Sequence, residues 1–318
     1  MDTSDCESFS ARKQGVLLTG ATGFIGQRLV AALLRDGHEV TILTRRPEEA
    51  TGLFDAVRCV RSMDELLAAH HIDVVINLAG ARILGWRWTT KRKAALRRSR
   101  VELTNGVVAW IARAEHKPRL MLSASAIGYY GLQAMGDLTP LGETAPPQAI
   151  FMSQLCQEWE AAARKAEQYG VQVACMRFGL VFGAQGALPM MLLPIKLGMG
   201  GPMGGGSQRM SWIHVDDVLR GIAHLWRLSE AGEGGKSVQA AYNFTAPEQV
   251  SQREFSRIAA GLAGRPSFMP TPGWPVRLML GEQADLLLEG QTVVPERLLA
   301  SGFAFRHATV KSALAGLL

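Results

Sequence analysis

The sequence predicts an α/β fold in which a doubly wound parallel sheet carries a smaller C-terminal lobe. Two observations lead to this fold class. Apolar runs of strand length alternate with stretches of helical period, which is typical of parallel strands joined by right-handed helical crossovers. The chain also has 318 residues, 47% of them hydrophobic, so it can bury a large core and still carry a lobe.

The alternation gives the expected elements in chain order. The expected strands comprise residues 16–19, 39–44, 74–78, 120–123 and 173–178. The expected helices comprise residues 25–36, 63–70, 89–113 and 152–169. The strands are short apolar runs, whereas the helices repeat apolar residues three and four positions apart.

The regular alternation ends near residue 183, where a segment rich in Gly, Pro and Met begins. We therefore expect a dinucleotide-binding domain of residues 14–182 and 213–246. A substrate-binding lobe of residues 183–212 and 247–318 should cover the carboxyl ends of the strands. Residues 178–195 carry no charge, but glycines and prolines interrupt them, so a membrane span is not expected.

The turn after the first strand predicts a nucleotide cofactor. Gly20, Gly23 and Gly26 lie between a buried strand and an amphipathic helix. Without side chains, the first two glycines let a pyrophosphate approach the amides at the helix N-terminus, and Gly26 lets the helix pack closely on the strand. An ordinary glycine turn is the alternative, but the strand–turn–helix setting favours a Rossmann domain.

The end of the second strand indicates which dinucleotide would bind. This strand ends in Thr44, Arg45 and Arg46, where an acidic residue would hydrogen-bond the ribose hydroxyls of NAD. Two guanidinium groups without a carboxylate favour a 2′-phosphate, so we expect NADP(H). A pair of solvated surface arginines is the alternative.

Five motifs together resemble the extended short-chain dehydrogenase/reductase family. They are TGATGFIG (19–26), NLAG (77–80), SASAIGYYG (123–131), RFGLVFG (177–183) and WIHVDDV (212–218). The segments SRVELT, CQEWE, GGGSQRMSWIHVDD, YNFTAPE and VPERLLASGFAF resemble an atypical branch whose members are called epimerase-family proteins. The resemblance covers residues 15–310 and implies a Rossmann fold with a C-terminal substrate lobe and bound NADP(H). It also implies further cofactor-binding residues: Thr22, Phe24, Ile25, Leu78, Ala79, Gly80, Arg100 and Phe178.

The acid/base pair of that family is replaced in this chain. In the family a Ser or Thr binds the reacting oxygen, a Tyr moves the proton, and a Lys four residues later lowers the pKa of the Tyr. Alignment on Glu160 places Met152 at the Tyr position and Cys156 at the Lys position. Ser125, or less well Ser123, matches the residue that binds oxygen.

Three explanations of this replacement stay open. Tyr129 or Tyr130, just after Ser125, supplies the proton in an altered geometry; these tyrosines would otherwise only stack and line a pocket. Alternatively, the substrate exchanges its proton through water. In the third explanation no redox step occurs, and the protein is a silent NADP(H)-binding sensor or partner-binding protein.

The expected substrate residues lie in and before the Gly-rich segment of the lobe. Gln208 and Arg209 offer an amide and a guanidinium, and Lys196 offers an ammonium group. Solvated loop side chains are the alternative for each of them. The chain is thus expected to be an NADP(H)-dependent oxidoreductase or epimerase-like enzyme acting on a small polar metabolite, and the cationic side chains would suit an anionic one.

Composition and charge exclude several other classes. The four cysteines lack metal-ligand or redox spacing, so no metal site is expected, and the polar start does not resemble a secretory signal. The charges of residues 91–100 fit the outer face of an amphipathic helix better than a nucleic-acid site. We expect a cytoplasmic monomer or homodimer with no membrane or nucleic-acid partner; a dimer would form through helices 89–113 and 152–169.

Overall fold

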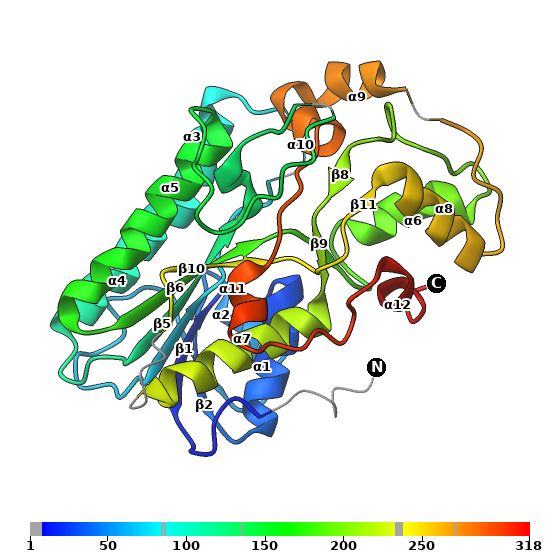
Figure 1. The fold of residues 1–318 in the computed structure, drawn as a ribbon. Helices are drawn as coiled ribbons and strands as arrows, with labels where there is room; N and C mark the ends of the chain where they lie inside the picture. Colours follow the sequence, from blue (N-terminus) through cyan, green and yellow to red (C-terminus); the bar gives the residue numbers. More distant parts are fainter. Residues whose placement is uncertain (1–7, 84, 86, 135, 233–237, 271) are drawn as a thin grey trace.

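The structure is a computed structural model that describes residues 8–318, except 84, 86, 135, 233–237 and 271 (Figure 1). At its centre lies a sheet of seven strands, all paired in parallel. In spatial order the strands are β10 (Ala241–Phe244), β6 (Gln172–Phe178), β5 (Leu120–Ala126), β4 (Val74–Asn77), β1 (Gly15–Thr19), β2 (Glu39–Leu43) and β3 (Val57–Val60). The strand order reverses between β1 and β4, which confirms the doubly wound sheet and marks where α/β folds bind ligands.

Helices cover both faces of this sheet (Figure 1). On one face lie α1 (Phe24–Arg35), α2 (Pro47–Thr51), α7 (Val215–Glu230) and α11 (Glu296–Ala300); on the other lie α3 (Thr90–Arg97), a π-helical turn (Arg98–Glu102), α4 (Leu103–Arg113) and α5 (Phe151–Arg164). Side chains alternate along a strand, so successive residues of β1 pack into the hydrophobic cores on opposite faces of the sheet. Val16 and Leu18 pack with α1 and α7, whereas Leu17 packs with α4.

The C-terminal part of the chain adds a second, smaller core. Its elements are β7 (Leu180–Phe182), α6 (Leu188–Lys196), β8 (Arg209–Met210), β9 (Trp212–His214), β11 (Val250–Ser251), α8 (Gln252–Leu262), α9 (Gly273–Leu280), a 3-10 turn (Gly281–Ala284), α10 (Asp285–Leu288) and α12 (Val310–Leu314). β7 pairs with β9 and β8 with β11, and α6, α8 and α12 share a core around Phe182 and Phe255. Leu298 and Phe303, by contrast, join the core of the main sheet, so the segment around α11 returns to that sheet.

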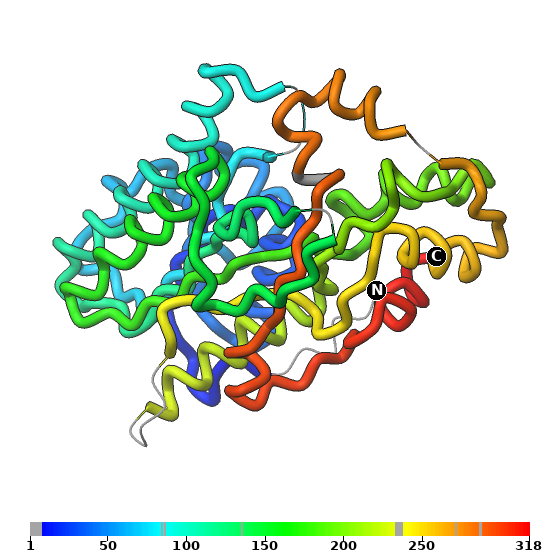
Figure 2. The backbone as a smooth tube through the Cα atoms, turned by 45° about the horizontal axis from the view of Figure 1, so that its top comes forward, coloured from blue at the N-terminus to red at the C-terminus, as the bar shows by residue number. Residues whose placement is uncertain are grey.

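The segment around α9 lies beside the residues that follow β4 (Figures 1 and 2). Lys93 and Glu282 form an ion pair with an N–O distance of 2.6 Å, and Arg87 donates a hydrogen bond to the carbonyl of Leu278. The C-terminal segment therefore covers the carboxyl end of the sheet. Of the described residues, none belong to a helix with both the length and the apolar character that crossing a bilayer demands.

Two features of the sheet region differ from the sequence prediction. Residues 63–70 form turns, so the helix expected there was wrong. Leu66 is buried but Leu67 is 64% exposed, and this short connection has no continuous apolar face to pack. The strands β3 and β10 were not predicted: β3 is partly exposed and includes Arg58, and Asn243 interrupts the short apolar run of β10.

Candidate functional site

The glycine turn brings backbone from three elements into close contact. Gly20 has a φ of +76°, and a Cβ on it would lie 2.8 Å from the carbonyl carbon of Leu78. A Cβ on Gly26 would lie only 2.1 Å from the carbonyl oxygen of Gly20. Gly23 is the N-cap of α1 and has no side chain to cap the first-turn amides. The turn is therefore a tight cradle that presents a helix N-terminus, as an anionic group requires.

Buried polar side chains hold the loop after β4 beside this turn. The hydroxyl of Thr19 donates to Asn77 Oδ1 (2.7 Å) and accepts from the backbone N–H of Ala79 (3.0 Å). The amide of Asn77 donates in turn to Thr104 (2.8 Å) and Ser123 (3.2 Å). Each polar atom named here is satisfied, so the predicted residues Leu78, Ala79 and Gly80 are fixed at the strand ends.

Three further predicted cofactor residues surround the glycine turn. Thr22, Phe24 and Ile25 are half-buried. The ring of Phe24 occupies the space beside Gly183, where a Cβ would lie 2.4 Å from Phe24 Cζ. Phe24 thereby connects the turn to the loop after β7. Phe178, at the end of β6, is also half-buried and packs edge-on against Phe244, with ring centroids 5.2 Å apart.

The arginines after β2 are free to meet a ligand. Arg45 and Arg46 are exposed, and Thr44 is half-buried. Arg46 pairs with Glu49 at 2.9 Å, but 71% of the Arg46 side chain is accessible to water. An ion pair so exposed contributes about 0–1 kcal/mol, so a phosphate could displace the carboxylate.

Arg100 is a buried cation beside the same loop. The residue is 5% exposed, and its guanidinium donates to the carbonyl of Ala81 (2.9 Å) and lies against Gly80. Its Nε is buried without an acceptor, and within the described part of the chain it forms no ion pair. Burial lowers the pKa of Arg100 to about 10. A positive charge held without a counter-charge suits a site that awaits an anionic ligand.

Ser125, the predicted oxygen-binding residue, is engaged with a buried ion pair. Its hydroxyl donates to Glu160 Oε1 at 2.7 Å. Arg177 holds both oxygens of the same carboxylate, with two hydrogen bonds of 2.8 Å. Ser125 is 2% exposed. In this geometry the hydroxyl stabilises the carboxylate of Glu160 and is not available to a substrate.

The two tyrosines pack around the same arginine. The hydroxyl of Tyr130 donates to Asn243 (2.6 Å) and accepts from Arg177 (2.9 Å). Burial, the largest effect, raises the pKa of Tyr130 to about 12. The ring centre of Tyr129 lies 3.4 Å from the guanidinium carbon of Arg177. This arrangement favours the packing interpretation of both tyrosines over proton transfer.

Met152 and Cys156 lie on the face of α5 that packs against the 3-10 turn after β5, Ile127–Tyr130. A Cβ on Gly128 would lie 3.2 Å from Met152 Cε and 3.8 Å from Cys156 Sγ. Burial raises the pKa of Cys156 to about 12, so the thiol is protonated at neutral pH. Met152 has no exchangeable proton. Neither side chain can do the work of the Tyr/Lys pair.

A cavity of about 350 Å³ opens at the carboxyl ends of β5 and β6. Residues 126–128 and 178–180 line it, together with Met152. Of the predicted substrate residues, Gln208 and Arg209 line the cavity, whereas Lys196 is exposed at the end of α6. Ser125, Tyr129 and Tyr130 are not among the described residues that line it.

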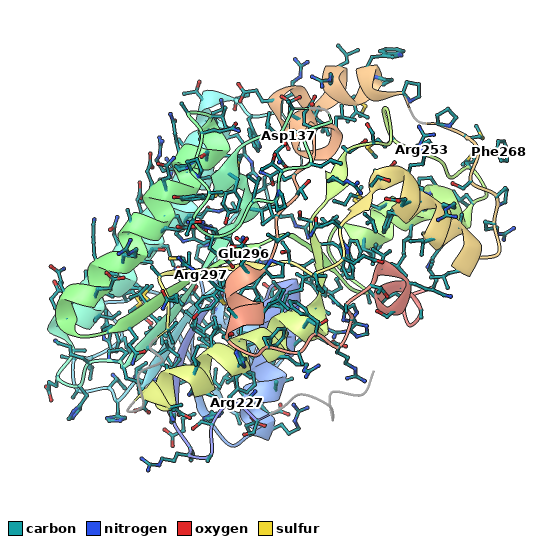
Figure 3. The ribbon with its side chains drawn as sticks, viewed as in Figure 1. Asp137, Arg227, Arg253, Phe268, Glu296 and Arg297 are labelled. Carbon is teal, nitrogen blue, oxygen red and sulfur yellow. The ribbon has the colours of Figure 1, made fainter. Side chains whose placement is uncertain are left out.

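A second, more polar cavity of about 490 Å³ adjoins the first. Asp137 and Arg253, both labelled in Figure 3, belong to its lining. Gln208, Arg209 and Gln291 line both cavities. Arg209 lies 3.5 Å from Glu254 and stands at their junction.

One group in the described part of the chain has metal-ligating side chains, namely His214, Asp216 and His307, whose candidate atoms lie within 4.8 Å of one another. The guanidinium of Arg28 binds Asp216 Oδ1 at 2.9 Å, and His214 Nδ1 accepts from the backbone N–H of Asp216. The carboxylate of Asp217 accepts from the N–H of His307 at 2.8 Å. Because the guanidinium would repel a cation, we interpret this group as the joint between α7 and the C-terminal segment.

Comparison with known proteins identifies the family that this chain resembles. The model of the NAD dependent epimerase/dehydratase family matches residues 16–241, and a domain of unknown function, DUF1731, matches residues 271–317. The chain is 36% identical to epimerase family protein YfhF of Bacillus subtilis (strain 168), over 95% of this chain and 97% of that one. It is also 36% identical to epimerase family protein SDR39U1 homolog, chloroplastic, of Arabidopsis thaliana, over 98% and 89%.

Solved structures show the same relationship. The crystal structure of human epimerase family protein SDR39U1 (isoform 2) with NADPH has a TM-score of 0.82 and 32% identity, over 95% of this chain and 98% of that one. A crystal structure of UDP-galactose 4-epimerase, at 18% identity over 95% and 98%, has a TM-score of 0.71 and shows the shared fold.

Proposed function

Because the chain belongs to the NAD dependent epimerase/dehydratase family, we propose that it is an NADP(H)-dependent oxidoreductase or epimerase-like enzyme for a small molecule. The observation that carries this proposal is the tight glycine turn, where a Cβ on Gly20 or on Gly26 would clash with backbone atoms 2.8 or 2.1 Å away. Gly23, the exposed N-cap of α1, has no side chain to block a pyrophosphate from the first-turn amides. The human relative whose structure includes NADPH supports a nicotinamide dinucleotide.

The chain's own residues would hold the cofactor as follows. Gly20, Gly23 and Gly26 would receive the pyrophosphate, and Arg45 and Arg46 would hold the 2′-phosphate. Around them the half-buried Thr22, Phe24, Ile25, Thr44, Leu78, Ala79 and Phe178, with Gly80 and Arg100, would line the crevice. When bound, NADP(H) supplies or accepts a hydride. The adjoining cavity at the carboxyl ends of β5 and β6 would hold the other reactant.

The proton of that reaction would come from water or from the substrate. Met152 has no proton to give, and the pKa of about 12 of Cys156 keeps its thiol from acting as a base. Ser125 would polarise a substrate oxygen only after its hydrogen bond to Glu160 is exchanged. Tyr129 or Tyr130 would act as the acid only after it has left its contact with Arg177.

A second function is a catalytically silent NADP(H) binder that senses redox state or serves a partner. The observation that favours it is the replacement of the acid/base pair by Met152 and Cys156, which pack beside Gly128 and offer no group that exchanges a proton at neutral pH. Turnover separates the two functions. An oxidoreductase oxidises NADPH in the presence of a carbonyl acceptor, and an epimerase-like enzyme converts its substrate without net consumption of the cofactor. A silent binder saturates with NADPH and converts no substrate.

The cofactor assignment is tested by titrating the protein with NADPH and with NADH and following the nicotinamide fluorescence. We expect NADPH to bind at least about tenfold more tightly, a difference of about 1.4 kcal/mol. The double variant Arg45→Ala/Arg46→Ala should lose this preference and keep its NADH affinity. Arg265→Ala, which removes an exposed arginine of the lobe, is the matched control. Equal affinity for both dinucleotides, or none for either, contradicts the assignment.

A further inference from the structure

The cavity beside the proposed cofactor site is lined mainly by apolar side chains. Five methionines contribute to it: Met152, Met190, Met191, Met203 and Met210. They come from α5, α6, the Gly-rich segment and β8, so the cavity collects them from four separate parts of the chain. Thioether side chains are flexible and polarisable, which lets them adapt to an apolar ligand of irregular shape.

The polar groups in this lining are mostly occupied by the protein itself. Gln291 donates to the carbonyl of Ile127 (3.1 Å), and Ser211 donates to the carbonyl of Gln291 (2.7 Å). Gln252 accepts from the backbone N–H of Met203 (2.7 Å) and donates to Ser256 (3.0 Å). A ligand with many hydroxyl groups would have to break these bonds or leave its own groups unsatisfied, and both are costly.

Arg209 is the one cationic side chain among the described residues that line this cavity. Its partner is Glu254, at 3.5 Å, and the side chains are 28% and 50% exposed. An ion pair this long and this exposed to water is weak. A single anionic group at the junction of the two cavities could therefore replace the carboxylate of Glu254.

The rim of the cavity is apolar as well. Met190, which lines the cavity, is 78% exposed. Phe268, labelled in Figure 3 at the outer edge of the lobe, is 68% exposed but does not line the cavity. The backbone N–H of Met269 donates to the carbonyl of Gly200 (3.1 Å), so the segment with Phe268 borders a residue of the cavity wall. Exposed apolar surface that continues into an apolar cavity is typical of a ligand entrance.

We propose that this cavity binds a molecule with an apolar body and one anionic end, the body among the methionines and the anion at Arg209. The inference rests on the proposed function, because it assigns a substrate class to the site beside the dinucleotide. The lining does not favour the polar metabolite expected from the sequence, nor a nucleotide sugar. At about 350 Å³ the cavity lies at the small end of ligand pockets, so the body is compact.

The test uses the full chain with and without saturating NADPH. 1-Anilinonaphthalene-8-sulfonate, an aromatic body with one sulfonate, serves as the fluorescent probe, and decanoate and UDP-glucose serve as competitors. We expect the probe to bind at one site and decanoate, but not UDP-glucose, to displace it. Met210→Lys places a charge among the methionines, and Met203→Trp fills the cavity without changing charge. Each substitution should lower the affinity for the probe by about tenfold or more.

The matched control is Met279→Lys, the same chemical change at a residue of α9 that is 72% exposed and does not line the cavity. It should leave the probe affinity within about twofold of wild type. Circular dichroism and thermal melting confirm that each variant is folded. Displacement by UDP-glucose, or unchanged binding in both cavity variants, overturns the inference. NADPH titration of the same samples reports separately on the proposed function, which stands if NADPH still binds.

Discussion

The ion pair between Glu160 and Arg177 should be among the most costly interactions to break in this protein. It joins α5 to β6, and the two side chains are only 10% and 5% exposed. Burial disfavours the charge of Arg177, but the hydrogen bonds and charge of Glu160 outweigh that effect and raise the pKa of Arg177 above its ordinary value. Glu160→Leu would leave that charge buried with no carboxylate. We expect a loss of about 3–5 kcal/mol in the free energy of unfolding.

Replacing both partners should cost less than replacing one. In the double variant Glu160→Leu/Arg177→Met no unpaired charge remains, and the side chains fill similar volumes. Ser125 and Tyr130 each lose a hydrogen-bond partner, at about 1 kcal/mol apiece. The double variant should therefore be more stable than Glu160→Leu alone, and a double-mutant cycle should show a large coupling energy.

The measurement is urea unfolding followed by far-UV circular dichroism and tryptophan fluorescence, with the denaturant slopes compared between variants. The exposed pair Arg97–Glu158 is the matched control, since it has the same residue types at 2.6 Å but side chains 46% and 40% exposed. Glu158→Leu should cost less than about 1 kcal/mol. The reasoning would be refuted if Glu160→Leu lowered the free energy of unfolding by less than about 1 kcal/mol, or if the double-mutant cycle showed no coupling between Glu160 and Arg177.

Gly26→Ala should weaken NADPH binding and destabilise the fold by about 1–3 kcal/mol, because its Cβ would clash with the carbonyl of Gly20. Gly261→Ala in α8, where a Cβ meets nothing within 4 Å, should be neutral or stabilising, and equal effects of the two changes in titration and melting would contradict this. Burial, and then the charge of His307, lowers the pKa of His214 to about 4. The unfolded chain takes up that proton near pH 6.5, so the free energy of unfolding should fall by up to about 3 kcal/mol from pH 6.5 to 4. Urea unfolding across this range should show a flatter profile for His214→Asn, which keeps an N-cap acceptor; an unchanged profile would contradict the assignment.

The sheet and the glycine turn could be predicted because their signals are local. β1, β2, β4 and β6 are short apolar runs, and the positions of Gly20 and Gly26 reflect backbone contacts within a few residues of the turn and at the neighbouring strand end. The edge strand β3 could not be predicted, because its residues are partly exposed and their pattern does not differ from that of a loop. The prediction of a helix at residues 63–70 was wrong. Whether so short a segment forms a helix depends on the burial of its side chains, which the sequence does not show.

The candidate site was harder to predict because its side chains meet across the fold. Ser125, Glu160 and Arg177 lie on three different elements, and the sequence does not show that the hydroxyl donates to the carboxylate. The same arginine draws Tyr129 and Tyr130 toward it. Arg177 stands at the start of the motif RFGLVFG and was the missed residue. The available signal was an arginine that follows four apolar residues of β6, Val173–Met176.

The apolar cavity and the replaced acid/base pair constrain the chemistry together. An alkoxide formed in an apolar site without a nearby proton donor would be strongly disfavoured. Met152 supplies no proton, and the thiol of Cys156 is fully buried behind it with a pKa of about 12. A substrate reduced here must therefore bring its own acidic group, admit water, or give a product anion that its own structure delocalises. A ligand whose anionic end lies at Arg209 is already deprotonated there, so that end cannot meet the first of these conditions. Turnover of such a ligand therefore needs water at the reacting carbon or a product anion that is delocalised, and a ligand that offers neither would leave the protein a silent binder.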